Sequence, residues 1–321
     1  MRILVTGITG FAGGHLAEAL SSRSDVELFG LSRHNRWPAV WKHLAGKAVL
    51  LNCDVADSPA VESVLREVRP ESIYHLAGYA HVGRSFQETE AAWTGNLIAT
   101  RSLYDAVLSW GQLPRILFVG SAMIYGDPER PGEAFDERCV LRPTSPYGSS
   151  KAAADLVSYQ YFHAQGLPIV RARPFNHIGP AQSAEFAVAH FAKQVAAISL
   201  GLRPPLLETG NLDPRRDVTD VRDMVRAYLA LMEKGRPGEA YNIGIGHTVS
   251  MREILGLLIK LAGVQAEIRQ RSDLVRSQEN AVVHADATKL REETGWRPTY
   301  SLEQTLKDTL DYWRSLLISG S

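Results

Sequence analysis

The chain has 321 residues, 45% of them hydrophobic and 22% charged, a composition typical of a globular protein with a large core. Lysine plus arginine and aspartate plus glutamate balance at 35 each, so no net charge draws the chain to nucleic acid or an anionic membrane. Only two cysteines occur and no apolar run approaches the roughly 20 residues that span a bilayer, so we expect a cytoplasmic protein without disulfides or a membrane partner.

Short apolar runs alternate with helical patterns through the first half of the chain. Strands are predicted at 3–6, 26–31, 48–52, 72–76, 116–119 and 168–173, with helices at 15–21, 60–68, 95–110 and 147–165. Runs that are apolar throughout fit strands buried on both faces. The alternation therefore predicts an α/β fold in which helices cover both faces of a parallel sheet.

The pattern changes after about Pro174, where proline and glycine become frequent. The elements look irregular from there to two amphipathic segments, 251–262 and 302–315, which predict C-terminal helices. We expect a smaller, loop-rich second lobe that is interleaved with the first.

A glycine-rich segment separates the first strand from the first helix. Glycines let the backbone turn tightly and approach a pyrophosphate, while the helix N-terminus offers free N–H groups and the positive end of its dipole. This placement predicts a dinucleotide site that includes Gly7, Thr9, Gly10, Phe11, Ala12 and Gly13.

The end of the second strand bears on the choice of dinucleotide. An NAD site usually has Asp or Glu here to accept from the ribose 2′-OH, whereas this chain offers Ser32, Arg33 and a second arginine, Arg36. Arginine and serine suit a 2′-phosphate, so we expect NADP(H), with NAD(H) possible, held by Ser32 and Arg33. Asp54, followed by Val55, is placed after the third strand to meet the adenine.

Three residues form the predicted catalytic group. Tyr147 and Lys151 stand four apart and therefore share one face of a helix, for which Ser145 and Pro146 read as the N-cap and first turn. A nearby cation favours the phenolate, so we expect Lys151 to lower the pKa of Tyr147. Tyr147 could donate a proton to a carbonyl oxygen as hydride reaches its carbon, and Ser121, at the end of a strand, could hydrogen-bond the same oxygen.

Five motifs together resemble the extended short-chain dehydrogenase/reductases, and the resemblance covers essentially the whole chain. The motifs are GITGFAG (7–13), HLAG (75–78), GSAMIYG (120–126), SPYGSSK (145–151) and RPFNHIGP (173–180). The resemblance implies an NADP-binding Rossmann domain, 1–173 plus 212–246, and a nucleotide-sugar-binding domain, 174–211 and 247–321. It also implies pairing of two copies through the helices at 95–110 and 147–165, and hence a homodimer.

The resemblance further implies roles for individual residues. Tyr147 and Lys151 would also contact the cofactor, and Asn96 would support the central helix. Cofactor contacts are implied for Leu76, Ala77, Gly78, Pro174 and His177. Substrate contacts are implied for Ser121, Ala122, Met123, Asn176, Arg216, Arg276 and Glu279. No metal is expected, because the ten histidines show no metal-ligand spacing.

The candidate reactions differ in the groups that they need. Similar 4,6-dehydratases carry acidic residues directly after the catalytic Thr or Ser, where this chain has Ala122 and Met123, so elimination lacks its base. An NAD-dependent 4-epimerase is permitted by the catalytic group, but Ser32 and Arg33 favour an exchanging NADPH and hence a 4-ketoreductase. A non-catalytic NADP-binding sensor would be expected to have lost the Ser/Tyr/Lys set.

The second lobe bears on the substrate. The motif at 173–180 and the stretch GNLDPRRDVTDVRDMVRAY, 210–228, resemble the GDP-mannose-processing branch, and within it the GDP-6-deoxy-4-keto-D-mannose reductases. That resemblance implies reduction of the 4-keto group of a GDP-4-keto-6-deoxy-hexose to a GDP-6-deoxyhexose such as GDP-D-rhamnose. Arg216 and Arg276 are candidates for the diphosphate, since guanidinium matches phosphate oxygens in two-pronged fashion.

Overall fold

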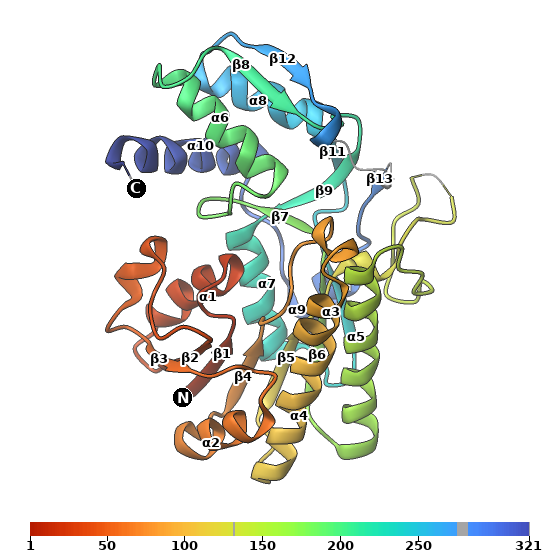
Figure 1. Ribbon diagram of the computed structural model, residues 1–321. Helices are drawn as coiled ribbons and strands as arrows, with labels where there is room; N and C mark the ends of the chain where they lie inside the picture. The colour runs from red at the N-terminus through yellow and green to blue at the C-terminus, as the bar shows by residue number, and fades with distance from the viewer. Residues whose placement is uncertain (131, 275–281, 321) are drawn as a thin grey trace.

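A seven-stranded parallel sheet forms the centre of the molecule (Figure 1), in a computed structural model that describes residues 1–130, 132–274 and 282–320. The strand order is β10-β6-β5-β4-β1-β2-β3, so the chain moves outward from β1 first to one side and then to the other. The strands are β1 (Arg2–Thr6), β2 (Glu27–Ser32), β3 (Val49–Asn52), β4 (Ser72–His75), β5 (Arg115–Val119), β6 (Ile169–Pro174) and β10 (Ala240–Ile243). The predicted doubly wound, Rossmann-type sheet is confirmed, with each of the six predicted strands placed to within one residue.

Helices cover both faces of this sheet. One face packs on α1 (Phe11–Ser21) and α7 (Val221–Lys234), through residues such as Leu16 and Tyr228. The other packs on α2 (Ser58–Val68), α4 (Ala99–Trp110) and α5 (Pro146–Gln165), through residues such as Leu65 and Leu103. The helix predicted at 95–110 is interrupted: a short helix α3 (Thr89–Trp93) runs into a π turn, Thr94–Ile98, before α4 begins.

A second lobe lies above the carboxyl ends of the strands (Figure 1). Its core joins α6 (Ala187–Ser199), α8 (Met251–Ala262) and α10 (Leu302–Ser319). Two small sheets complete it: β9 (Arg215–Asp220) pairs with β7 (Asn176–Ile178), β11 (Thr248–Ser250) and β13 (Val282–Val283), and β8 (Leu206–Thr209) pairs with β12 (Glu267–Gln270). A short helix, α9 (Thr288–Thr294), lies against α7.

The expectation of irregular structure after Pro174 is wrong for two long helices, α6 and α7. In α6 the buried Val188, Phe191 and Val195 recur at the spacing of one helix face, a signal that the abundance of proline and glycine around it obscured. The division into two domains stays a prediction. Within 212–246, α7 packs on the large sheet and β10 is one of its edge strands, whereas β9 pairs with strands of the second lobe.

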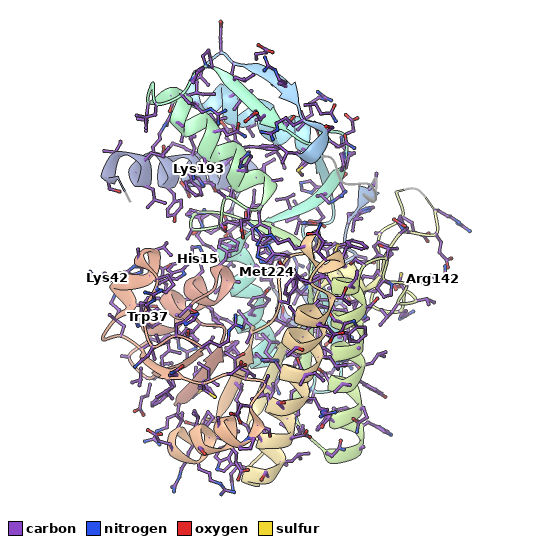
Figure 2. All side chains as sticks on the ribbon, in the orientation of Figure 1. His15, Trp37, Lys42, Arg142, Lys193 and Met224 are labelled. Atoms are coloured by element: carbon purple, nitrogen blue, oxygen red, sulfur yellow. The ribbon has the colours of Figure 1, made fainter. Side chains whose placement is uncertain are left out.

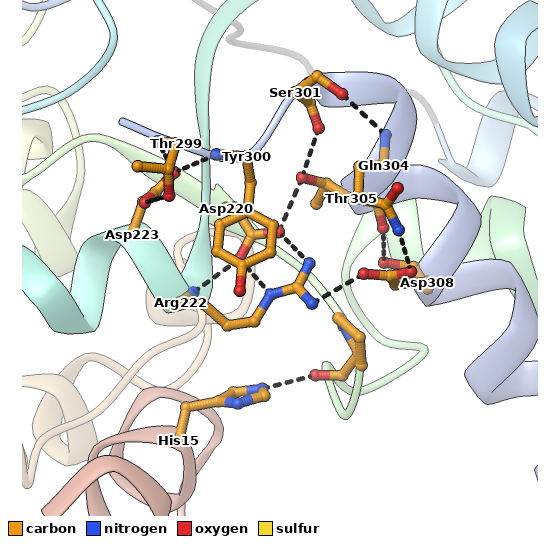
Figure 3. A network of polar contacts seen from close by, with 12 residues as sticks. His15, Asp220, Arg222, Asp223, Thr299, Tyr300, Ser301, Gln304, Thr305 and Asp308 are labelled. Atoms are coloured by element: carbon orange, nitrogen blue, oxygen red, sulfur yellow. Dashed lines mark hydrogen bonds and ion pairs between the residues drawn. The ribbon is translucent and has the colours of Figure 1, made fainter. Parts of the chain in front are cut away.

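A polar network joins α10 of the second lobe to the start of α7 (Figure 3). The Arg222 guanidinium forms ion pairs with Asp220 and Asp308, each at 2.7 Å, and its Cζ lies 3.8 Å from the centre of the Tyr300 ring. Thr305 donates to the same Asp220 carboxylate at 2.7 Å. Because Asp220 is buried and also caps α7, these bonds fix the end of β9 against α10.

The neighbouring Asp223 anchors the segment that leads into α10. Its buried carboxylate accepts from the backbone N–H groups of Thr299 and Tyr300 at 2.8 and 2.9 Å. On the far side of the junction, His15 of α1 donates to the carbonyl of Pro180 at 2.9 Å, and Figure 2 shows His15 at this boundary between the lobes. No helix in the described ranges has both the length and the apolarity to cross a membrane.

Candidate active site

The glycine loop has the geometry of an anion cradle. Gly7 has a φ of +71°, and a Cβ added there would come within 2.7 Å of the Ala77 nitrogen. A Cβ at Gly13 would lie 2.0 Å from the Gly7 oxygen, so the loop cannot accept a side chain at either position. Gly10 is the N-cap of α1 and provides no side-chain cap, which leaves N–H groups of the first turn for a ligand. These features fit the pyrophosphate of a dinucleotide.

A cavity of about 380 Å³ lies beyond this loop at the end of β2. Thr9 and Ser32 line it, and their hydroxyl oxygens are 3.5 Å apart. His34, Arg36 and Trp37 line it as well, and Figure 2 shows Trp37 on the side of the molecule that carries β2 and β3. The cavity therefore offers a hydroxyl, an imidazole and a guanidinium to an anionic group, beside an aromatic wall.

Three residues proposed for the adenosine end, Arg33, Asp54 and Val55, do not line this cavity. Arg33 is exposed and does not line the cavity, whereas Arg36, three residues on, does. Asp54 is also exposed, and its carboxylate accepts from the Ala56 backbone N–H at 3.0 Å, while Val55 is buried. The segment 33–37 is a loop, so sequence alone did not show which arginine faces the cavity.

The structure brings Ser121, Tyr147 and Lys151 together at the carboxyl end of β5. Tyr147 lies in the first turn of α5, which Ser145 caps by accepting from the Gly148 N–H at 3.1 Å. Lys151 lies one turn later and its Nζ donates to the carbonyl of Val119 at 3.1 Å, two residues before Ser121. Ser121, Tyr147 and Lys151 are 7%, 9% and 6% exposed, so the group is almost fully enclosed.

Burial dominates the ionisation of this group. It raises the pKa of Tyr147, and a side-chain hydrogen bond with Ser121 offsets only part of the rise. The expected lowering of the Tyr147 pKa is therefore wrong: a buried phenol resists ionisation more than its neighbours favour it. Burial also lowers the pKa of Lys151 to about 8. The arrangement holds a protonated phenol, which suits a proton donor.

The end of β4 forms one wall beside Lys151. Leu76, Ala77 and Gly78 follow β4, and a Cβ added at Gly78 would lie 2.6 Å from Asn96 Oδ1 and 3.2 Å from Lys151 Nζ. Gly78 thus lets a ligand approach two polar atoms at once. Asn96 itself lies in the π turn and is 1% exposed.

Two further predicted cofactor residues come from the end of β6 and from β7. Pro174 is the last residue of β6 and is buried. His177 stacks on Phe11 of the glycine loop, with ring centres 5.8 Å apart and planes 7° apart, while Ala12 follows Phe11 in α1. Burial lowers the pKa of His177, which favours the neutral imidazole. His177 therefore meets the glycine loop, as expected for a residue near the cofactor.

Among the predicted substrate residues that the structure describes, Asn176 and Arg216 lie on small-sheet strands of the second lobe, whereas Ala122 and Met123 follow β5. Asn176 is exposed on β7, which pairs with β9, where Arg216 lies. Arg216 Nη1 donates to the carbonyl of Arg215 at 2.8 Å. Ala122 is buried, and Met123 donates its backbone N–H to Ser121 Oγ at 3.1 Å. Arg276 and Glu279 lie outside the described residues.

Sequence reasoning missed Ser85, which touches the catalytic group directly. Its Oγ accepts from the Tyr147 backbone N–H at 3.2 Å and donates to the carbonyl of Val82 at 2.6 Å. Ser85 is fully buried in a short 3₁₀ helix, Arg84–Phe86, more than sixty residues before Tyr147, and no local pattern marks it. Among the described residues, no three His, Cys, Asp or Glu side chains are grouped so as to hold a metal ion.

Comparison with known proteins agrees with this geometry. The family model described as GDP-mannose 4,6 dehydratase matches residues 4–309. The chain is 32% identical to GDP-6-deoxy-D-mannose reductase from Pseudomonas aeruginosa over 98% of this chain and 97% of that protein.

Two solved structures show the same architecture. RMD from Pseudomonas aeruginosa complexed with NADPH superposes with a TM-score of 0.85 at 31% identity, covering 98% of this chain and 99% of that one. UDP-glucose 4-epimerase from Thermus thermophilus in complex with NAD gives a TM-score of 0.86 at 29% identity, covering 98% and 99%. The chain thus belongs to the GDP-mannose 4,6-dehydratase family, within the extended short-chain dehydrogenase/reductases.

Proposed function

We propose that this chain is an NADPH-dependent oxidoreductase that reduces the 4-keto group of a GDP-4-keto-6-deoxy-hexose, yielding a GDP-6-deoxyhexose such as GDP-D-rhamnose. One observation carries the proposal. Ser121, Tyr147 and Lys151 are all present and enclosed, but the two residues directly after Ser121 are Ala122 and Met123, and neither can carry a proton. The similarity to the Pseudomonas aeruginosa reductase supports the choice of substrate.

NADPH, when bound, supplies hydride to the carbonyl carbon. Tyr147 donates its phenolic proton to the carbonyl oxygen, because its raised pKa keeps the phenol protonated until the oxygen gains negative charge. Ser121 donates a hydrogen bond to the same oxygen. Lys151 stabilises the phenolate that remains, which then regains a proton from solvent.

The cavity at the end of β2 supports NADP(H) over NAD(H). Ser32 and Arg36 line it, and no Asp or Glu stands among its lining residues. We assign the 2′-phosphate to Ser32, His34 and Arg36, in place of Ser32 and Arg33. The pyrophosphate falls to the loop 7–13.

Reductases and 4-epimerases of this family separate by cofactor use. A reductase exchanges its cofactor in every turnover, whereas a 4-epimerase regenerates it on the protein. Oxidation of NADPH should therefore be rapid with GDP-4-keto-6-deoxy-mannose, generated in place by a dehydratase, and absent with GDP-mannose. Turnover of a 4-hydroxy nucleotide-sugar on protein purified with tightly held NAD would instead favour the epimerase.

Tyr147→Phe tests the catalytic assignment. Loss of a general acid typically costs on the order of 10² to 10⁴ in rate, and cofactor binding should survive. Tyr159→Phe is the matched control, since Tyr159 lies on the same helix but is 45% exposed. Full turnover in Tyr147→Phe would refute the assignment.

We also propose a cytoplasmic homodimer that pairs through α4 and α5. Apolar side chains are exposed at the surface of this helix pair: Leu156 is 58% exposed, Tyr159 45% and Ile98, at the start of α4, 37%. Large apolar side chains exposed on one helix pair are consistent with a protein interface there. Both cysteines are free, which agrees with a reducing compartment.

A further inference from the structure

A buried histidine, His75, links strand β1 of the large sheet to helix α4. It is the last residue of β4 and is 1% exposed. Its Nδ1 lies 2.7 Å from Thr6 Oγ1, and its Nε2 lies 3.0 Å from Thr100 Oγ1. Thr6 lies on β1, the strand that pairs with β4, and Thr100 lies on α4, which covers one face of the sheet. One imidazole therefore connects a neighbouring strand to a covering helix.

The neighbouring bonds decide which ring nitrogen carries the proton. The Thr100 hydroxyl donates its only proton to the carbonyl of Asn96 at 2.6 Å, so it must accept from His75 Nε2. In a neutral ring Nδ1 is then an acceptor, and it receives the proton of Thr6. The Thr6 oxygen in turn accepts from the Ala77 backbone N–H at 3.1 Å. Every bond in the chain has one donor and one acceptor.

Charge on the ring is excluded by its surroundings. Burial lowers the pKa of His75 to about 3, and the nearby charge of Lys151 acts in the same direction. A neutral ring cannot act as a general acid here at neutral pH, and its two hydrogen bonds go to Thr6 and Thr100 rather than to the catalytic group. Its contribution is therefore geometric.

The chain of bonds continues from Asn96 to the catalytic tyrosine. Asn96 Nδ2 donates to Ser150 Oγ at 2.9 Å, and Ser150 Oγ donates to the Tyr147 carbonyl at 2.9 Å. Asn96 Oδ1 is buried and has no hydrogen-bond partner among the described residues, and it faces the same open side of Gly78 as Lys151 Nζ. Asn96 therefore sits between the wall at Ala77–Gly78 and the first turn of α5.

We propose that His75, as the Nε2–H tautomer, is a positioning residue that holds the π turn of Asn96 against Ala77–Gly78 and thereby sets Tyr147 and Lys151 relative to that wall. The inference rests on the catalytic role proposed for Tyr147. Misplacement of a catalytic group by about 1 Å can cost on the order of 10² in rate, so a rigid link between the two sides matters for turnover.

Three variants of His75 separate positioning from packing. His75→Leu removes both bonds, and kcat should fall by up to about 10²-fold, with a smaller change in the KM for NADPH. His75→Gln places an amide N–H near the position of Nε2 and should recover most of the loss. His75→Asn can accept from Thr6 but is too short to reach Thr100, so its kcat should resemble that of His75→Leu.

Tyr104→Phe is the matched control. It removes a buried hydrogen bond between the Tyr104 hydroxyl and Ser158 Oγ, 2.8 Å long, which joins α4 to α5 outside the chain of bonds. The thermal midpoint should fall while kcat stays unchanged. An equal loss of kcat in Tyr104→Phe would show that any buried bond matters here, and would overturn the proposal.

Nitrogen chemical shifts of the His75 imidazole in the unmodified protein give a test that needs no turnover. A protonated Nε2 and a bare Nδ1 are expected at neutral pH. A protonated Nδ1 overturns the proposal whatever the kinetics show. If kcat is unchanged in His75→Leu and His75→Asn while Tyr147→Phe is inactive, the positioning role of His75 is overturned and the proposed function stands. An active Tyr147→Phe would overturn both the positioning role of His75 and the proposed function.

Discussion

Asp155 neutralises two buried arginines, and its replacement should be among the most destabilising single changes in the large domain. It lies on α5, one turn after Lys151, and is fully buried. Its carboxylate accepts from Arg171 Nη1 at 2.6 Å and from Arg173 Nε and Nη2 at 3.0 and 2.8 Å. Asp155→Asn keeps the shape of the side chain but removes its charge and turns one of the two accepting oxygens into an NH₂ donor, which then faces an arginine donor.

The magnitude follows from burial. The arginine side chains are 11% and 6% exposed, so water cannot replace the lost counter-charge. Breaking a buried ion pair by removing one partner typically costs about 3–5 kcal/mol, and we expect the free energy of unfolding of Asp155→Asn to fall by that amount. An exposed pair contributes at most about 1 kcal/mol, so the control is Asp311→Asn, which loses the half-exposed partner of Lys307 and Arg314.

The same network sets an acid dependence. Burial alone would raise the pKa of Asp155, but the hydrogen bonds and charges of Arg173 and Arg171 outweigh it and lower the pKa. The folded state then binds fewer protons than the unfolded state, so this stabilisation is present above about pH 4 and is lost as the pH falls below it. Urea unfolding followed by tryptophan fluorescence, across that range, measures both effects. If Asp155→Asn lost no more stability than Asp311→Asn, the reasoning would be refuted.

Three further predictions concern the cofactor, the catalytic lysine and assembly. Arg36→Ala should raise the KM for NADPH about tenfold, which is the low end of the range for losing a charge-assisted hydrogen bond, because Arg36 is exposed. Arg33→Ala should leave this KM unchanged. Equal effects of the two variants would contradict the assignment of Arg36 to the 2′-phosphate. The pKa of Lys151 is lowered to about 8 in the folded state, so between about pH 8 and 10 the unfolded state binds more protons than the folded state. The free energy of unfolding therefore rises with pH over this range. Lys151→Met should flatten that rise, as measured by urea unfolding at a series of pH values. Leu156→Glu, on the exposed face of α5, should yield monomers by light scattering, and a dimer of unchanged affinity would place the interface elsewhere.

Local patterns were enough to predict the large sheet, the glycine loop and the placing of Tyr147 and Lys151 one turn apart on a helix. Continuous apolar runs mark strands that are buried on both faces, and all six predicted ones are present. The glycine loop and the Tyr147–Lys151 spacing depend on residues that are close in sequence, and both predicted features are formed. What a short stretch of chain specifies by itself could be predicted.

Contacts between distant segments could not be predicted in this way. Ser85 reaches Tyr147 from the short 3₁₀ helix that precedes α3, and the partners of Asp155 lie on a strand that follows α5. The pKa of Tyr147 moved opposite to expectation because burial of the phenol outweighs its hydrogen bond with Ser121. Arg33 and Arg36 are chemically alike, and only the path of the loop decides which one faces the cavity.

The packing of α10 also bears on the order in which the protein can become complete during synthesis. The large sheet gains its final strand, β10, at residue 243, so its hydrogen bonding can close while the last part of the chain is still being made. The core of the second lobe includes Leu306 and Leu310 of α10, against α6 and α8. That lobe stays open on one side until α10 arrives. The nascent protein can therefore form the dinucleotide cradle well before it can enclose a substrate.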